Sequence, residues 1–289
     1  MAFDQETGTV NLRKEVIDKV IRDVAKPMYK FKQAVRIVKT NAWKQTFFRG
    51  STDILAGASG NATKGIPRGA NFPQAVTTLE EVNSYIEKYG LEDFIHWEDI
   101  LTNEVDLQKR TLFKLSQGVV KAVDDEIWDV LSESQSPSAI QSVTITGGQT
   151  WDASSAAIID DLMAAKQAIG EENYDTTNLM AFISEKDHRS IVNYLAEKGA
   201  QFPSVGTDMA KNGRIGKLAG IQLIVSNSVT ASFALVVIPK TVGAWRESVS
   251  LRSDLKQEAF KGTRIRVVEM GVAQLTDPKA AVLIINTQA

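Results

Sequence analysis

The most regular hydrophobic pattern of this chain lies in residues 104–133. Apolar side chains recur there at every third or fourth position, as at Leu112, Val119 and Ile127, and no proline interrupts them. This spacing places the apolar side chains on one face of an α-helix. The pattern therefore predicts a single helix of about 28 residues, which would be about 42 Å long at 1.5 Å per residue.

The rest of the pattern predicts shorter helices and strands. Residues 11–26 have apolar positions four residues apart, which predicts a short helix that ends at Pro27. Helical and extended patterns then alternate between residues 151 and 227, where Asp152 and Ser184 are the expected N-caps of two helices. The chain closes with three extended segments, at residues 251–260, 264–274 and 280–287. Together these elements predict an α+β fold.

One long segment is expected to leave the body of the protein. Residues 34–49 and 75–97 are predicted to be extended, and the stretch from Gly50 to Pro73 is rich in Gly, Pro, Ser and Asn. A loop of this length inside a compact domain is uncommon and usually functional. We therefore predict a β-excursion of about 50 residues that contacts another molecule.

The composition excludes several kinds of chemistry. The 289 residues include two His and no Cys, which excludes disulfides and thiolate ligands. Neither His96 nor His188 has a second ligand at metal-binding spacing, and the chain has no G-x-S-x-G motif. A strand is expected directly after Gly213–Gly216, which favours a turn over a phosphate-binding or RNA-binding loop. We therefore expect no catalytic residue, no metal site and no cofactor.

The net charge of −2 conceals two segments of opposite sign. Residues 11–50 contain eleven Lys and Arg against three acids, whereas residues 79–106 contain nine acids against one Lys. Two solvated faces would explain this pattern, and so would contacts between the two segments, within a subunit or between neighbouring subunits. The candidate intersubunit contacts are Lys39, Lys44, Arg49, Lys64, Arg68, Glu80, Glu81, Glu98, Asp99, Asp124, Asp125 and Glu126.

Three motifs occur in an informative order. They are FIHWEDILTNEVDL at residues 94–107, VDDEI at residues 123–127 and GRIGKLAGIQLIVSN at residues 213–227. With the order of the predicted elements, they resemble the major capsid proteins of tailed phages that have the Hong Kong 97 fold, together with the related encapsulin shells. The resemblance covers nearly the whole chain.

The resemblance implies a division into four parts. These are an N-terminal arm, an extended β-hairpin loop, a peripheral domain that contains a long spine helix, and an axial domain. The implied boundaries are 1–41 for the arm, 42–95 for the loop, 96–150 and 228–279 for the peripheral domain with the spine helix at 104–133, and 151–227 and 280–289 for the axial domain.

The resemblance also implies a function, which is that of a structural protein and not an enzyme. A major capsid protein would self-assemble in the host cytoplasm, as pentamers and hexamers, into the icosahedral shell of a virion. Its partners would be copies of itself, a separate scaffolding protein, a portal, and double-stranded DNA on the inner face, with no membrane. Two alternatives remain: an encapsulin-type compartment, and a nucleic-acid-binding protein that uses the basic residues 11–50.

Overall fold

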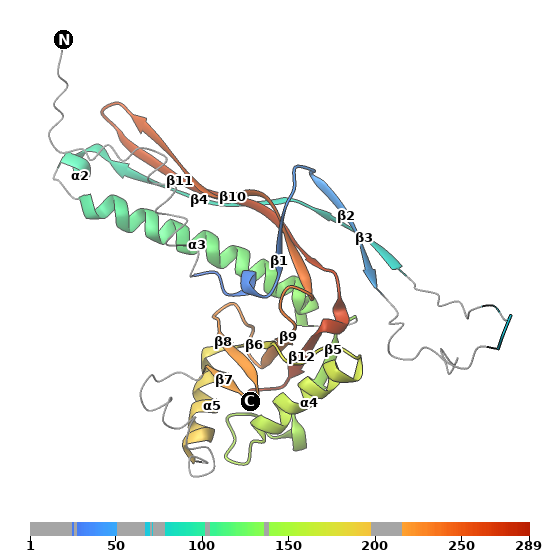
Figure 1. The fold of residues 1–289 in the computed structure, drawn as a ribbon. Helices are drawn as coiled ribbons and strands as arrows, with labels where there is room; N and C mark the ends of the chain where they lie inside the picture. The colour runs from blue at the N-terminus through green and yellow to red at the C-terminus, as the bar shows by residue number, and fades with distance from the viewer. Residues whose placement is uncertain are drawn as a thin grey trace.

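The chain folds into a long sheet backed by a helix, a more compact α/β body and a separate hairpin (Figure 1). The strands pair in the orders β1-β10-β11-β4, β5-β12-β9-β6-β8-β7 and β2-β3. This mixture of helices and strands agrees with the predicted α+β fold. The computed structural model describes residues 25, 28–50, 67–69, 71, 79–101, 105–135, 139–197 and 216–289. Most of the predicted helix at 11–26 and most of the Gly213–Gly216 turn lie outside these residues.

The long sheet has four strands and is covered on one face by helix α3 (Figure 1). Its strands are β1 (Arg36–Lys39), β10 (Gly243–Glu258), β11 (Gly262–Leu275) and β4 (Glu87–His96). β1 runs parallel to β10, and the other neighbours are antiparallel. The β10–β11 register shifts between Glu247 and Arg252, and such irregularities bend and twist a sheet locally.

Helix α3 (Val105–Leu131) confirms the long helix predicted from the hydrophobic pattern. The apolar side chains that recur along it are buried, and Val123, Ile127 and Leu131 have no exposed surface. At Gly118, an added Cβ would lie 2.4 Å from Leu91 Cδ1 of β4. Glycine therefore allows β4 to lie close against the helix. The short helix α2 (Trp97–Leu101) precedes α3.

The α/β body is built on the six-stranded sheet and the helices α4 (Ile158–Glu171) and α5 (Glu185–Glu197). Its strands are β5 (Gln141–Thr144), β12 (Ala281–Ile285), β9 (Phe233–Val237), β6 (Leu179–Ile183), β8 (Ile221–Val225) and β7 (Lys217–Leu218). Alternate residues of β9 face opposite sides: Val236 lies in the core with α4 and α5, and Leu235 lies in the core with α3. Burial on both faces explains why the central strands β12, β9 and β6 are wholly apolar.

Within the described residues, four short 3₁₀ helices connect these elements. They are η1 (Phe31–Gln33), η2 (Glu133–Gln135), η3 (Thr146–Gly148) and η4 (Pro278–Ala280). Of these, η1 belongs to the N-terminal arm and lies against α3.

One of the two predicted helix caps is confirmed and the other is wrong. The backbone N–H of Asp187 donates to Ser184 Oγ at 3.1 Å, so Ser184 caps α5 as expected. Asp152 does not cap a helix, because α4 begins only at Ile158. The buried Trp151 donates its backbone N–H to the C=O of Thr287, and the residues after it form turns. Asp152 instead forms an ion pair at 3.2 Å with a lysine of α5.

Strand pairing crosses the segment boundaries drawn from the sequence. β5 and β9 belong to the six-stranded sheet, although the sequence places them in the segments 96–150 and 228–279. β4 was placed in the extended loop 42–95, yet all of it pairs with β11. These pairings join segments far apart in the chain, and the local hydrophobic pattern carries no information about them.

Candidate subunit interface

The β2–β3 hairpin brings together two of the predicted contact residues. β2 (Lys44–Gly50) and β3 (Leu79–Tyr85) are antiparallel, and Arg49 lies opposite Glu80. Arg49 donates from Nη2 and Nε to the same Glu80 carboxylate oxygen, at 2.6 and 3.1 Å. The expected pairing of basic and acidic segments therefore occurs here within one subunit. An exposed pair of this kind contributes about 1 kcal/mol or less.

One exposed face of this hairpin carries two aromatic rings among polar side chains. Phe48 and Tyr85 are 60% and 57% exposed, and Trp43, just before β2, is 60% exposed. In the register, Phe48 lies opposite Glu81 and Tyr85 lies opposite Lys44, so the two aromatic rings share a face with two predicted contact residues. A two-stranded hairpin is marginally stable alone in water, and exposed apolar surface marks an interaction site. The hairpin is therefore suited to contact a neighbour.

The remaining predicted contact residues lie on different parts of the surface. Lys39 is exposed at the end of β1, and Arg68 is exposed in a turn of the excursion. Glu98 and Asp99 are exposed in the first turn of α2. Lys64 lies outside the described residues. These positions stay predictions of intersubunit contact.

The acids of the spine helix have different surroundings. Asp125 forms an i,i+4 ion pair with Lys121 at 3.9 Å. Glu126 is half-buried, and burial raises the pKa of its carboxyl, with the nearby charges of Glu87 and Asp129 adding to the effect. Both side chains remain partly accessible to a neighbouring subunit.

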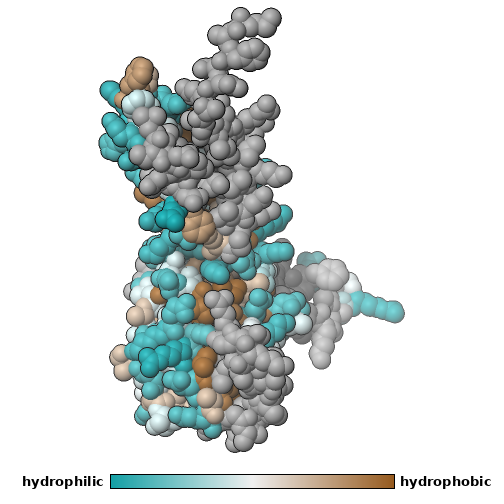
Figure 2. All heavy atoms as spheres, turned by 90° about the vertical axis from the view of Figure 1, so that its left-hand side faces the viewer, coloured by the Kyte–Doolittle hydropathy of each residue, from teal (hydrophilic) through white to brown (hydrophobic). Residues whose placement is uncertain are grey.

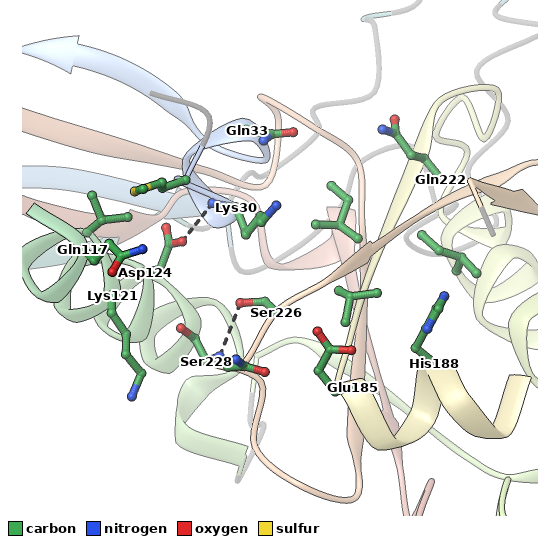
Figure 3. A pocket seen from close by; sticks show the side chains of 16 residues that line it. Lys30, Gln33, Gln117, Lys121, Asp124, Glu185, His188, Gln222, Ser226 and Ser228 are labelled. Carbon is green, nitrogen blue, oxygen red and sulfur yellow. Dashed lines mark hydrogen bonds between the residues drawn. The ribbon is translucent and has the colours of Figure 1, made fainter. Parts of the chain in front are cut away.

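Asp124 differs from the other candidates, because it is buried inside the subunit. Its carboxylate accepts a hydrogen bond from the backbone N–H of Lys30 at 2.8 Å (Figure 3). It accepts a second from the backbone N–H of Phe31 at 3.3 Å. The Phe31 ring stacks on Phe182 of the six-stranded sheet at 4.3 Å and lies 5.7 Å from the Trp128 ring of α3. Asp124 is thus an anchor for the N-terminal arm within the subunit, which differs from the expected role at a subunit contact.

A second anchor of the arm was missed by the sequence analysis. Glu269 of β11 has no exposed surface and accepts hydrogen bonds from the Tyr29 hydroxyl and from Lys32 Nζ. Lys32 Nζ also lies 3.8 Å from the centre of the Tyr29 ring. The sequence did carry one signal for this anchor. Inward-facing and outward-facing side chains alternate along β11, and Glu269 follows the inward-facing Val267 by two residues. Glu269 therefore occupies a position where an apolar side chain is the rule.

The arm also forms one wall of a cavity between α3 and the α/β body. The cavity has a volume of about 720 Å³, and its lining includes Lys30, Lys121, Glu185 and His188 (Figure 3). Within the described ranges, no three His, Cys, Asp or Glu side chains are grouped as a metal site. None of the helices described here is long and apolar enough to cross a bilayer.

Asp124 gives the stability of the subunit a defined pH dependence. Burial raises the pKa of its carboxyl from 3.8 to about 6, although the two backbone hydrogen bonds oppose this shift. Between about pH 4 and pH 6 the folded chain therefore holds a proton that the unfolded chain releases. Protonation of Asp124 favours folding in this range. Its contribution to the free energy of unfolding is lost as the pH rises through 6.

We expect this dependence to disappear in Asp124→Asn, which cannot titrate. Relative to that variant, the wild-type free energy of unfolding is expected to fall by about 2 kcal/mol from pH 4 to pH 7. Urea denaturation of the unassembled subunits at several pH values measures the difference. Parallel profiles for the two proteins would contradict the assignment.

The comparisons with known proteins agree on one family. The sequence model of the phage capsid protein family matches residues 79–284, more than two thirds of the chain. The capsid structure of the cyanophage P-SCSP1u has a TM-score of 0.67 and 14% identity, with 89% of this chain and 88% of that chain covered. A comparison with curated proteins gives no match.

Two further solved structures have the same fold. A structure of Mycobacterium phage Che8 has a TM-score of 0.61 and 14% identity, with 90% of this chain and 92% of that chain covered. A virus-like particle from Pyrococcus furiosus has a TM-score of 0.63 and 12% identity, with 93% and 98% covered. The fold is thus that of capsid subunits, as the resemblance implied. The chain therefore belongs to the phage capsid protein family, and it is a shell subunit with the Hong Kong 97 fold.

Proposed function

We propose that this protein is the major subunit of a tailed-phage head, in which pentamers and hexamers of the chain enclose double-stranded DNA. The observation that carries this proposal is the β2–β3 hairpin, which projects away from the two larger sheets (Figure 1). It exposes two aromatic rings on one face, flanked by Lys44 and Glu81. A shell subunit needs such a surface, because each copy contacts several others.

We assign each proposed domain of the subunit to one of the three sheets. The hairpin is the extended loop, and the long sheet with α3 is the peripheral domain. The six-stranded sheet with α4 and α5 is the axial domain, which surrounds the fivefold and sixfold axes. The described residues of the N-terminal arm, 25 and 28–41, are anchored to the body by Asp124 and Glu269.

The proposed partners are a separate scaffolding protein, a portal and the packaged DNA. The basic sequence of residues 11–50 supports contact with phosphate on the inner face. Assembly takes place in the host cytoplasm, before DNA is packaged.

Electron microscopy of the full-length protein, expressed alone and with its scaffolding protein, tests the proposal. We expect closed icosahedral shells tens of nanometres across. Shells purified from infected cells are expected to contain nuclease-protected double-stranded DNA. Shells filled with a protein cargo would instead indicate an encapsulin-type compartment, and the absence of any shell would overturn the proposal.

The hairpin face provides a specific prediction. The double variant Phe48→Ser/Tyr85→Ser is expected to reduce the yield of shells at least about tenfold, because it removes two large apolar contacts. Thermal unfolding of the unassembled subunit is expected to change little, since both rings are exposed in it. Phe48→Tyr/Tyr85→Phe is the matched control, because it keeps both rings and is expected to assemble normally. Wild-type yield from the serine variant would rule out this face as a contact.

A further inference from the structure

One aromatic ring of the N-terminal arm lies between the spine helix α3 and the α/β body. Phe31 has no exposed surface. Its ring stacks on the Phe182 ring of β6, with 4.3 Å between the ring centres, and lies 5.7 Å from the Trp128 ring of α3. The Trp128 indole N–H donates to Thr230 Oγ1, in the segment after β8, at 3.0 Å. Phe31 is therefore part of the core that joins α3 to the body.

The anchors that hold this ring belong to α3 and to the long sheet. Asp124 of α3 accepts the backbone N–H groups of Lys30 and Phe31, at 2.8 and 3.3 Å. Glu269 of β11 accepts a hydrogen bond from Lys32 Nζ. These bonds fix the arm on both sides of the ring, whereas the ring itself contacts the body. The arm is thus attached to one part of the subunit and packs against the other.

Beside the ring, the space between α3 and the body is a cavity of about 720 Å³. Gln117 and Lys121 of α3 line one side of it. Glu185 and His188 of α5 line the other side, and Lys30 of the arm lies between the two walls (Figure 3). Figure 2, a view from the side, shows hydrophobic surface at mid-height, between the long sheet above and the α/β body below. Protein interiors are close-packed, so a space of this size leaves room for the two parts of the subunit to approach each other.

One polar atom in the wall of this cavity is unsatisfied. His188 Nε2 is buried and has no hydrogen-bond partner among the described residues, although most buried polar side-chain atoms have one. The amide of Gln117 and the ammonium group of Lys121 belong to the opposite wall. Approach of α3 to α5 would therefore bring a hydrogen-bonding group towards this atom.

We propose that residues 28–33 of the arm are a removable spacer, which sets the angle between α3 and the α/β body. Ile127 and Leu131 of α3 lie in one core with Leu283 of β12, so this end of α3 is the pivot. When the arm is docked, Phe31 keeps the preceding turns of α3 away from α5. When the arm is withdrawn, those turns approach α5 and the cavity closes.

The two positions of the arm give the subunit two shapes. Packed elements of this kind move as rigid parts about a hinge and do not deform continuously. Copies of one chain around fivefold and sixfold axes meet their neighbours at different angles, and a spacer that is docked in one setting and withdrawn in the other supplies this difference. This use in a shell rests on the proposed function, whereas the spacer itself concerns the single subunit.

Distances between two spin labels in the unassembled subunit test the spacer. The chain has no Cys, so Lys114→Cys on α3 and Arg189→Cys on α5, both at exposed positions, can be labelled specifically. Phe31→Ala is expected to shift the distribution of label distances to shorter values, because the cavity closes. Phe31→Leu keeps a large apolar side chain and is the control, with the wild-type distance expected. An unchanged or longer distance in Phe31→Ala would overturn the inference.

A second pair of labels separates a change of angle from unfolding. Ser142→Cys on β5 and Arg189→Cys both lie in the α/β body, and the distance between them is expected to be the same with and without the Phe31 ring. If Phe31→Ala does not fold, Asp124→Ala replaces it, because this change removes two hydrogen-bond acceptors of the arm and leaves the ring. A second, shorter α3–α5 distance is expected in that variant, and the wild-type distribution would overturn the inference. The measurement uses subunits before assembly, so a failure to form shells would contradict only the proposed function.

Discussion

Replacing Glu269 by alanine is expected to lower the free energy of unfolding of the unassembled subunit by about 3–5 kcal/mol. The change leaves the Lys32 ammonium group and the Tyr29 hydroxyl without their buried acceptor. The side chains of Lys32 and Glu269 are 8% and 0% exposed, so water does not replace the lost partner. An uncompensated buried charge is among the largest single-residue costs in a folded protein.

The matched control for this prediction removes both charges. Lys32→Met/Glu269→Met leaves no unpaired ion, and we expect it to recover most of the stability lost in Glu269→Ala. Urea denaturation of the unassembled subunits measures all three proteins. A loss below about 1 kcal/mol in the single variant would show that the pair does not anchor the arm.

Gly262→Ala is expected to destabilise the subunit by about 3 kcal/mol or more, the second of the two largest effects. Gly262 has a φ of +143°, and an added Cβ would lie 2.0 Å from the C=O oxygen of Ile95. The obstacle is the backbone of β4, which cannot move aside without breaking its pairing with β11. The end of the long sheet therefore has to open.

Gly147→Ala is the control for this change. It separates the effect of backbone strain from the effect of a steric clash between the added Cβ and a neighbouring strand. Gly147 also has a positive φ, of +68°, but no atom lies within 4 Å of its added Cβ. Its alanine variant is expected to lose only about 1 kcal/mol. Equal losses in the two variants would show that strain alone, and not the approach of β4, explains the effect at Gly262.

The two anchors of the arm have a structural consequence for assembly. Residues 29–32 contact α3 through Asp124, the long sheet through Glu269 and the six-stranded sheet through Phe182. The arm then continues into β1 and the hairpin. The hairpin is thus attached to a segment that joins all parts of the body, so loss of an anchor is expected to affect both stability and the position of the hairpin.

Some of the fold and of the candidate interface could be predicted from local patterns. The period of the apolar residues predicted α3 because a helix of this length has one buried stripe. The Gly- and Pro-rich stretch from Gly50 to Pro73 lies mostly outside the described residues, but the opposite charges of Arg49 and Glu80 do meet in the hairpin. Each of these features depends on residues near one another in the chain or on a simple count of charges.

Other features could not be predicted, because they depend on residues far apart in sequence. Lys32 belongs to the basic segment, which predicts a side chain that is solvated or in contact with an acidic segment. In the structure it is buried against Glu269, which lies 237 residues away in the sequence. Asp124 belongs to an acidic run, and only the position of the arm decides that it is buried while Asp125 is not. The exposed ring of Phe260 has no periodic signal, since it lies in a turn.

The sequence by itself determined the kinds of element, their order and the separation of charge, because propensity and periodicity act over a few residues. It also showed the motifs by which the chain resembles capsid proteins. Only the tertiary structure decided which strands share a sheet, which acid anchors the arm and which aromatic side chains remain exposed. The physical reason is that burial and ion pairing are set by the packing of distant segments, and the same Asp or Lys is solvated or buried according to what lies against it.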